Sequence, residues 1–505
     1  MISRSFKASS IAAAALLAAC GGGNDEPVTP TPTPPPVVSV APSTEPALDA
    51  AKGFLAKFDV LRASAPTSSS AYLTLNDGCY LADGRSKGYS AADFESDTLA
   101  VASRQFEIGS TRTAPEVVAE RSSMNPDLST RREIDIKYVV NYKDGTKNEV
   151  AEETIISGSS SGAKMADGST CAAPESKSDW RFYGNRKLVR TLVTAVNERI
   201  DRTLLATGLP LATPVVYSKY LSLTVNDPAN VATYAIITGP GLSVTTTGAV
   251  GSLKLISVRV LRTAPELAGK PGNVVDWRDV DSWRVCQNAA GNNGAAAATA
   301  DCVAHGANIG NTWGYYNNAS GAALDTSFAT LNITAGDAYT IAVYNDDGWK
   351  TVNGQLGKTP IATYTNVLRA LPFSATTLAG TGPTADLFAR FTANTKTPAE
   401  VATAIRTKAA ISTDATWSKP GAMPDGRATQ LADIYAFEQG NANNNGTAFP
   451  RSRRILFDYP GAQATSATFT QPVPVTALVL PTFASFALEY NNRNGNNVWS
   501  QYAWQ

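Results

Sequence analysis

The stretch EIDIKYVVNYKDGTKNEVAEETIIS, residues 133–157, decides the fold class because it carries an alternating strand pattern up to a turn and a returning strand after it. Its first half places an apolar residue at every second position, namely Ile134, Ile136, Tyr138, Val140 and Tyr142. This period is typical of a strand with one buried face. Asp144 and Gly145 then favour a tight turn, after which KNEVAEETIIS returns. The sequence therefore predicts a long antiparallel hairpin.

Helices and further strands are expected around this hairpin, within residues 47–205. Before it, apolar residues recur at helical spacing, at Leu48, Ala51, Leu55, Phe58 and Leu61. A second short helix is expected at residues 91–96. After the hairpin, DWRFYGNRKLVRTLVTAV contains two strands separated by Gly184 and Asn185. This part of the chain is therefore predicted to be α+β.

The order of these elements and the motif WRFYGNRK, residues 180–187, resemble the nuclear transport factor 2-like, or SnoaL-like, proteins. The resemblance implies a cone-like domain in which helices and a bent antiparallel sheet enclose a pocket. Members of that family bind a partner or ligand, or act as isomerases and dehydratases. The candidate pocket carboxylates are Asp93, Asp97 and Glu107, and residues 47–205 contain no histidine for an Asp–His pair.

The remaining chain is predicted to be all-β and mainly antiparallel. A β-sandwich is expected over residues 206–370, with an insertion at residues 264–325. Its strand-like segments are YSKYLSLTV, VATYAIITGPGL, LKLISVRVL and LNITAGDAYTIAVYNDDGWKTV. The last of these predicts a hairpin that turns at Asp347 and Gly348.

A second β-sandwich with a helical insertion is expected over residues 371–505. RRILFDYP, SATFTQP and FASFALEYNNRNGNNVWSQYAW supply strands, the last with a turn at Asn494 and Gly495. The helical insertion, TPAEVATAIRTKAA, begins with a capping-box signature. AGDAYTIAVYNDDG and ATWSKPGAMPDG resemble fibronectin type III and immunoglobulin-like modules. That resemblance implies that Tyr339 is the tyrosine near the start of an alternating strand and that Trp417 is a core residue.

The N-terminus predicts an exported, lipid-anchored protein. A positively charged start and a short apolar run precede LAAC, residues 17–20, which resembles the lipobox of bacterial lipoproteins. The resemblance implies a signal peptide over residues 1–19, a lipidated Cys20 and, because Gly21 follows, sorting to the outer membrane at its periplasmic face or the cell surface. Residues 20–46 are rich in proline and threonine and are predicted to be a disordered linker.

Cysteine usage predicts two disulfides in this exported chain. The chain has five cysteines, and an even number remains when Cys20 is lipidated. Of the three possible connectivities we favour Cys79–Cys171 and Cys286–Cys302, because each pair then falls inside one domain. A zinc site is disfavoured, since no Cys-x-x-Cys spacing occurs and the sequence has a single histidine.

Other partners and catalytic groups receive little support. The chain has 43 basic and 43 acidic residues and no basic block, which argues against a nucleic-acid partner. GSSSG, residues 158–162, matches the nucleophile motif G-x-S-x-G, but no helix pattern follows Ser160. His305 stands alone in a glycine- and asparagine-rich stretch. We therefore assign no catalytic residue and no cofactor.

The insertion at residues 264–325 is the candidate ligand site. It gathers aromatic side chains among Asn, Gly and Ala, namely Trp277, Trp283, Trp313, Tyr315 and Tyr316. Exposed aromatics beside amides suit a sugar-stacking surface, whereas buried ones would form a small satellite core. Within the insertion, DWRDVDSW offers calcium ligands at Asp276, Asp279 and Asp281, or an exposed acidic turn.

These observations favour a binding or structural role over catalysis. The leading hypothesis is a membrane-anchored envelope lipoprotein that binds a glycan, an envelope component or a protein. The first alternative is an enzyme that acts on a small molecule or glycan with carboxylates of the cone-like domain. The second alternative is a purely structural spacer or assembly subunit.

Overall fold

A computed structural model gives the fold of this protein. It describes residues 41–63, 73–86, 111–125, 128–141, 147–158, 170–171, 180–242, 250–268, 283–286, 325–326, 329–350, 359–379, 388, 390–394, 396–407, 411–418, 431–440, 453–454, 457–458, 466–471, 483–492 and 496–504.

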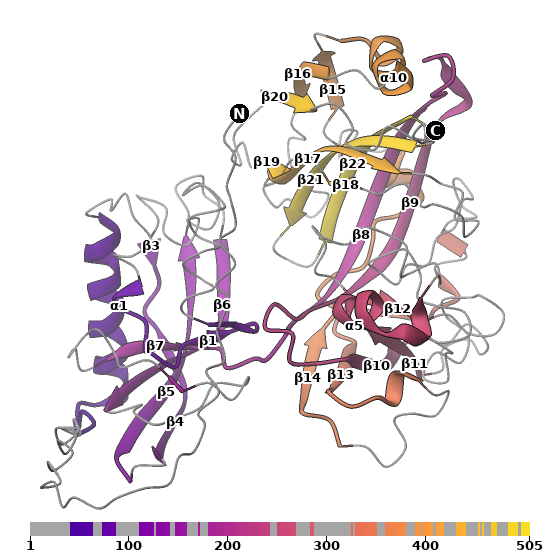
Figure 1. Ribbon diagram of the computed structural model, residues 1–505. Coiled ribbons are helices and arrows are strands. Elements are labelled where there is room, and N and C mark those ends of the chain that lie inside the picture. Colours follow the sequence, from indigo (N-terminus) through magenta and orange to yellow (C-terminus); the bar gives the residue numbers. More distant parts are fainter. Residues whose placement is uncertain are drawn as a thin grey trace, which may run out of the picture. The chain divides into compact units, whose positions relative to one another are not determined.

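The first part is a helix packed on an antiparallel sheet (Figure 1). Its elements are α1 (Ala47–Ala63), β1 (Leu81–Ala82), β2 (Arg85–Ser86), β3 (Thr111–Arg112), β4 (Glu116–Met124), β5 (Thr130–Asn141), β6 (Lys147–Gly158) and β7 (Arg181–Gly184). The hairpin predicted from residues 133–157 is confirmed, because β5 and β6 pair from Asn141 opposite Lys147 onward. Both β3 and β4 pair with β5 on its other side.

The predicted first helix is also confirmed, and its apolar stripe forms the core of this part. Ala51, Leu55 and Phe58 are buried against the sheet, while Leu48 at the helix start is 42% exposed. The core comprises Ala50, Ala51, Phe54, Leu55, Phe58, Ile134, Ile136, Tyr138, Val140, Ile155, Trp180 and Phe182. The expected helix at residues 91–96 lies outside the described residues.

The predicted disulfide between Cys79 and Cys171 is present, with Cα atoms 4.8 Å apart. Both cysteines pack with Ile156 and Tyr183 in a small buried cluster. Cys286 is also disulfide-bonded. The partner of Cys286 lies outside the described residues, so its pairing with Cys302 stays a prediction.

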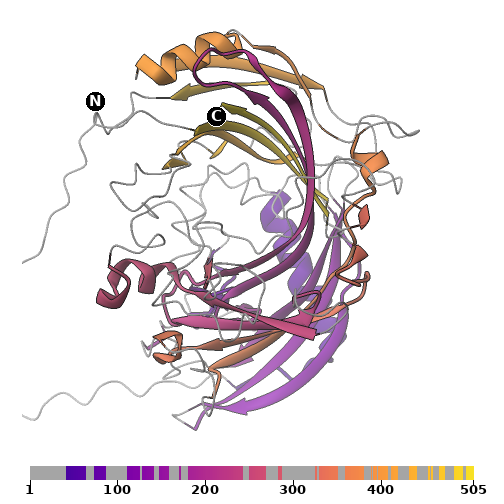
Figure 2. The same ribbon diagram turned by 90° about the vertical axis from the view of Figure 1, so that its right-hand side faces the viewer.

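The second sheet joins strands that are far apart in the sequence. Its strands are β8 (Arg190–Thr203), β9 (Pro210–Asn226), β17 (Leu431–Gly440), β18 (Arg453–Arg454), β19 (Phe457–Asp458), β21 (Phe483–Asn492) and β22 (Asn496–Trp504). The order is β18-β17-β21-β22-β8-β9, with β19 beside β17. All of these pairs are antiparallel except β22 with β8. Figure 2 shows β8 and β9 as long, strongly bent strands.

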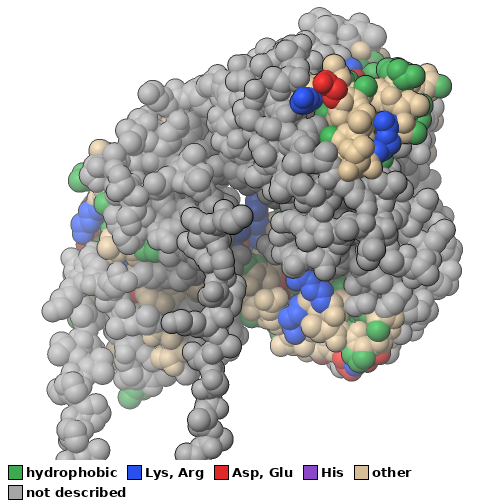
Figure 3. Space-filling view, turned by 45° about the horizontal axis from the view of Figure 1, so that its top comes forward, with side chains coloured by type: hydrophobic (Ala, Val, Ile, Leu, Met, Phe, Trp, Pro, Cys, Tyr) green, Lys and Arg blue, Asp and Glu red, His purple; other side chains and the backbone are tan. Residues whose placement is uncertain are grey.

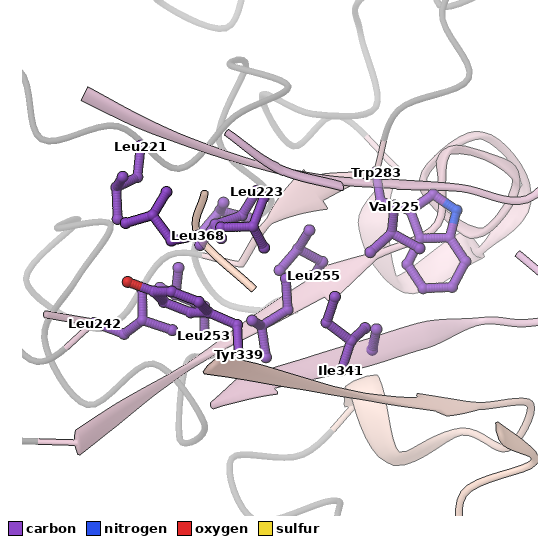
Figure 4. Packing of buried hydrophobic residues seen from close by; sticks show 14 of the residues in the cluster. Leu221, Leu223, Val225, Leu242, Leu253, Leu255, Trp283, Tyr339, Ile341 and Leu368 are labelled. Atoms are coloured by element: carbon purple, nitrogen blue, oxygen red, sulfur yellow. The ribbon is translucent and has the colours of Figure 1, made fainter. Parts of the chain in front are cut away.

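A third sheet packs on β8 and β9. It has the order β12-β11-β10-β13-β14, with β10 (Tyr234–Pro240), β11 (Val250–Ile256), β12 (Arg284–Val285), β13 (Ala338–Tyr344) and β14 (Ala362–Val367). One face meets the apolar face of β8 and β9, so that Leu221 and Leu223 lie against Leu255 and Tyr339 (Figure 4). The other face packs on α5 (Val258–Thr263), η2 (Pro265–Leu267) and η3 (Gly348–Lys350).

A small antiparallel sheet and two helices complete the described elements. They are β15 (Arg390–Asn394), β16 (Ile411–Ser418), β20 (Ser466–Gln471), α9 (Ala375–Leu378) and α10 (Pro398–Thr407). The capping box predicted for the last helix is confirmed. The backbone N–H of Thr397 donates to Glu400 at 2.7 Å, and the N–H of Glu400 donates back to Thr397 Oγ1 at 3.2 Å.

The coarse prediction of an α+β part followed by mainly antiparallel β-structure is confirmed. Two local predictions are wrong. The second half of LKLISVRVL is helix α5, because Ser257 caps it by accepting a hydrogen bond from the N–H of Val260. Gly348 begins a 3-10 turn rather than a hairpin turn, since its N–H donates to the Asp346 carboxylate at 2.7 Å, and β13 pairs instead with β14.

Strand pairing also crosses both domain boundaries expected from sequence. The hairpin of β8 and β9 spans the boundary after residue 205. The parallel pair of β8 and β22 joins residues 195–203 to residues 496–504.

Candidate functional site

Four polar side chains interrupt the apolar layer between α1 and its sheet. They form the Glu153 cluster, which consists of Asp59, Arg112, Tyr138 and Glu153. Strand register explains their positions, because residues directly opposite one another in an antiparallel pair share a face. Arg112 lies opposite the buried Val140.

Glu153 reaches the same face through an irregularity in the hairpin. It lies opposite Ile136, which is fully buried under α1. The ladder shifts register between Ile136 and Tyr138, so one extra residue of β6 is accommodated there, as in a β-bulge. The shift places a carboxylate on a face that is otherwise apolar.

The Glu153 cluster is held together by hydrogen bonds and charge. The hydroxyl of Tyr138 donates to Glu153 Oε2 at 2.8 Å. The Arg112 guanidinium pairs with Asp59, and its side chain is 2% exposed. The same guanidinium lies 4.0 Å from the centre of the Phe58 ring, a distance at which a cation and an aromatic face attract.

Burial raises the pKa of Glu153, and the hydrogen bond from Tyr138 and the charge of Arg112 partly oppose that rise. Burial also raises the pKa of Tyr138 well above its ordinary value, with the Glu153 charge as the second cause. The pKa of Tyr80 is raised by burial first and then by the charges of Glu153 and Asp83. Both phenols therefore stay protonated, and Glu153 holds its own proton more firmly than an exposed glutamate does.

Such a carboxyl can act in two ways. As an acceptor it can hold a hydroxyl or amine of a ligand, because the geometry records only Tyr138 as its hydrogen-bond donor within the described part of the chain. As a proton carrier it has the raised pKa that general acids and bases in enzymes share. Arg112 is committed to Asp59 and supplies positive charge from one side.

Trp283, predicted to lie on a ligand surface, is instead a core residue. It is 1% exposed, its backbone N–H donates to the carbonyl of Val225 at 2.9 Å, and its ring packs in the cluster shown in Figure 4. The physical reason is that Trp283 directly precedes β12, which pairs with β11 at the edge of the third sheet, so its ring packs in the core between that sheet and the strands β8 and β9. Tyr339 lies near the start of β13 and is fully buried, and its hydroxyl donates to the carbonyl of Pro240 at 3.0 Å.

Most other residues singled out in the sequence lie outside the described residues. They are Cys20, Asp93, Asp97, Glu107, Ser160, Asp276, Trp277, Asp279, Asp281, Cys302, His305, Trp313, Tyr315 and Tyr316. Trp417 lies in β16 opposite Phe391.

Metal-ligand groups, apolar helices and surface charge were also compared with what particular functions require. Within the described ranges, no set of three or more His, Cys, Asp and Glu side chains is arranged to hold a metal ion. No helix of the described segments is both long and apolar enough to cross a membrane. On the face in Figure 3, described Lys and Arg side chains lie in separate small groups.

Comparisons with known proteins found no match of any kind: no protein-family model, no curated protein and no solved structure matches this chain.

Proposed function

We propose that this protein is a bacterial envelope lipoprotein, held at the outer membrane by lipid on Cys20, whose α+β part binds a small ligand at the Glu153 cluster. The observation that carries the binding role is the carboxyl of the half-buried residue Glu153, which accepts one hydrogen bond from Tyr138. The cone-like fold of the first part and the fibronectin-like character of the later sheets belong to the same proposal.

Disulfide bonding supports the exported location. Cys79 and Cys171 form a disulfide, and Cys286 is bonded as well. Disulfides persist in oxidising compartments such as the bacterial periplasm and the cell surface. The lipobox-like LAAC and the proline- and threonine-rich linker after it agree with a tether at the membrane.

The chemistry of the cluster favours a ligand with hydroxyl or amine donors. Glu153 accepts hydrogen bonds. Tyr138 and Tyr80 keep their protons, so their hydroxyl groups can donate or accept hydrogen bonds. The ring of Phe58 and the Tyr138 ring supply apolar surface beside these groups. A neutral or cationic polar molecule suits this combination better than an anion, because Arg112 is already paired with Asp59.

An enzyme that moves a proton is the second candidate function. The raised pKa of Glu153, next to the Tyr138 hydroxyl, favours it. Glu153 would then take or give the proton of a bound substrate. The two functions separate in a Glu153→Gln variant, which in an enzyme would still bind substrate but would lose turnover.

Membrane attachment is tested by replacing the lipidated cysteine. Wild type and Cys20→Ala are expressed in a bacterial host with radiolabelled palmitate, and membrane and soluble fractions are compared. We expect label and membrane association in the wild type and neither in Cys20→Ala. Membrane association that survives the substitution would contradict the proposed anchor.

Ligand binding is tested on the full chain with a matched pair of variants. A library of polar metabolites and cell-wall fragments is screened against the wild type, and hits are titrated by calorimetry against Glu153→Gln and Glu116→Gln. Glu116 is an exposed glutamate on β4 of the same sheet. We expect a hit that Glu153→Gln weakens about tenfold or more, as loss of a hydrogen bond to a charged group predicts. Equal affinities for both variants would exclude the Glu153 cluster as the site.

A further inference from the structure

Two arginines and a tyrosine lie together on the face of the first sheet that points away from α1. Ile134 of β5 is buried under α1, so alternation along the strand places Arg131 on the outer face. Phe182 of β7 also packs under α1, so the next residue, Tyr183, turns to the outer face. Arg186 follows in the turn after β7, and its guanidinium carbon lies 3.9 Å from the centre of the Tyr183 ring. We call Arg131, Tyr183 and Arg186 the Arg186 site.

The half-buried Arg186 has hydrogen-bond donors that are not used and that reach solvent. Its Nη1 donates to the carbonyl oxygens of Cys79 at 2.5 Å and of Tyr183 at 3.4 Å. Its Nε and Nη2 donate no hydrogen bond within the described part of the chain, and neither atom is fully buried. Stacking on Tyr183 uses the flat face of the guanidinium and leaves the edge formed by Nε and Nη2 free. Such an edge can hold a carboxylate or phosphate by two parallel hydrogen bonds.

The carboxylates whose charges act on this guanidinium are already paired. They are Glu133 and Asp77. Glu133 accepts from Arg131 at 2.7 Å and from Arg121 at 2.6 Å, with one bond at each oxygen. Asp77 pairs with the buried Arg181 at 2.8 Å. Each of these carboxylates is therefore shared with other arginines, and a half-buried positive charge without its own counter-ion is costly.

Arg131 supplies a second positive charge beside Arg186. Its guanidinium carbon lies 5.8 Å from the centre of the same Tyr183 ring, and its side chain is 18% exposed. Its Nε donates to Glu133 and its Nη1 to Asn125, so Nη2 has no partner within the described ranges. Burial lowers the pKa of Arg186, and the charge of Arg131 acts in the same direction. A bound anion would offset the repulsion between the two guanidinium groups.

The turn that carries Arg186 is held in a conformation that side chains rarely adopt. Arg186 has a φ of 59°, in the left-handed region where residues other than glycine are uncommon. Its N–H donates to the carbonyl of Leu81 at 2.9 Å. The preceding Asn185 exchanges two hydrogen bonds with Asp83, each 3.0 Å long. These contacts fix the backbone from which Arg186 reaches the Tyr183 ring, and backbone strain of this kind is often found at binding sites.

We infer that the Arg186 site binds the phosphate group of a ligand, with Arg186 as a bidentate donor and Arg131 as the second cation. A phosphate suits the site better than a carboxylate, because its three free oxygens can accept from both guanidinium groups and its charge is larger. A soluble phosphate ester and a lipid headgroup share this chemistry. The inference goes beyond the proposed function, because the site lies on the opposite face of the sheet from the Glu153 cluster, and either site can fail its test without the other.

The test uses the full chain with Cys20→Ala as the parent, so that the proposed lipid anchor does not itself hold the protein on vesicles. Glycerol 3-phosphate and acetate are titrated by calorimetry, at one ionic strength, into the parent and into Arg186→Gln, Arg186→Lys and Arg190→Gln. Arg190→Gln is the matched control, because it removes one positive charge at an exposed position of β8. The same proteins are sedimented with phosphatidylcholine vesicles that contain or lack phosphatidic acid. Circular dichroism checks that each variant is folded.

We expect glycerol 3-phosphate to bind the parent more tightly than acetate does, and Arg186→Gln to weaken its binding about tenfold or more. Arg186→Lys keeps the charge but loses the two-bond edge, so it should weaken binding by less than Arg186→Gln. Arg190→Gln should bind like the parent.

The two arms of the test separate the sources of the phosphate. Binding of glycerol 3-phosphate without sedimentation on vesicles would support a soluble ligand. Sedimentation that requires phosphatidic acid, and that glycerol 3-phosphate competes away, would support a lipid headgroup. The inference would be overturned by absence of binding in both arms at millimolar concentration, by acetate binding as tightly as glycerol 3-phosphate, or by equal effects of Arg186→Gln and Arg190→Gln.

Discussion

Removal of the Cys79–Cys171 disulfide should destabilise the α+β part strongly. The bond joins cysteines 92 positions apart. For a loop of that length, the chain-entropy relation gives a loss of about 4.6 kcal/mol. Native domains are stable by only about 5–15 kcal/mol in total. The loop contains β3 to β6, so the loss should be felt in the sheet that holds the Glu153 cluster.

Amide hydrogen exchange at β5 is the appropriate measurement, because it reports the stability of this sheet in the full chain. Wild type is compared under non-reducing conditions with a Cys79→Ala, Cys171→Ala variant. A Cys286→Ala, Cys302→Ala variant is the control, since Cys286 packs in the third sheet instead. We expect protection in β5 to fall by about three orders of magnitude in the first variant, where each factor of ten is 1.4 kcal/mol. Unchanged protection there would refute the reasoning.

Two further predictions concern a crowded glycine and the buried glutamate. Gly239→Ala should destabilise the protein by about 2–4 kcal/mol, because the new methyl would displace the Tyr339 ring and disturb its hydrogen bond to Pro240. An ideal Cβ at Gly239 lies 2.3 Å from the Tyr339 ring, whereas nothing lies within 4 Å of an ideal Cβ at Gly53. Gly53→Ala should therefore stabilise helix α1 by about 0.5–1 kcal/mol. Calorimetry that finds Gly239→Ala as stable as Gly53→Ala, or more stable, would contradict the packing. Since the folded-state pKa of Glu153 is raised, the stability tied to its protonated form is complete below its unfolded pKa and is lost as pH rises through the folded pKa. Urea denaturation should show that Glu153→Gln lacks this loss, and parallel pH profiles would contradict the burial of the carboxyl.

Local sequence patterns predicted the elements whose cause is local. The α1 stripe, the hairpin of β5 and β6, and the capping box of α10 all depend on neighbouring residues. The local predictions failed where a side chain accepted a hydrogen bond from a backbone N–H group and so favoured a helix or a 3-10 turn. Ser257 caps α5 where a continuous strand was expected, and Asp346 ties the N–H of Gly348 into a 3-10 turn.

The Glu153 cluster could not be predicted because it depends on a register shift. A regular ladder counted from Asn141 opposite Lys147 would place Glu153 opposite Asp135, which lies on the other face from Ile136. The observed shift places it opposite Ile136 and turns it toward α1. The sequence carries one hint, a carboxylate two positions before the apolar pair Ile155 and Ile156, but it does not mark where the ladder slips.

The strands that pair with β8 could not be predicted either, because the alternation of apolar and polar residues defines the two faces of a strand but not which strand lies beside it. The structure shows what fixes that neighbour. Asn197 is fully buried in β8, its amide nitrogen lies 3.3 Å from the side-chain oxygen of Asn496 and from the carbonyl of Asn497, and its oxygen accepts from the N–H of Phe373 at 2.8 Å. A slip of one residue would turn the β22 side chains to the opposite face and take from the buried Asn197 amide nitrogen the partners that β22 supplies, which is costly. The register that satisfies Asn197 is the one that sets Trp499 beside Glu198, so a structural amide on one face of the sheet determines which aromatic ring accompanies the carboxylate on the other.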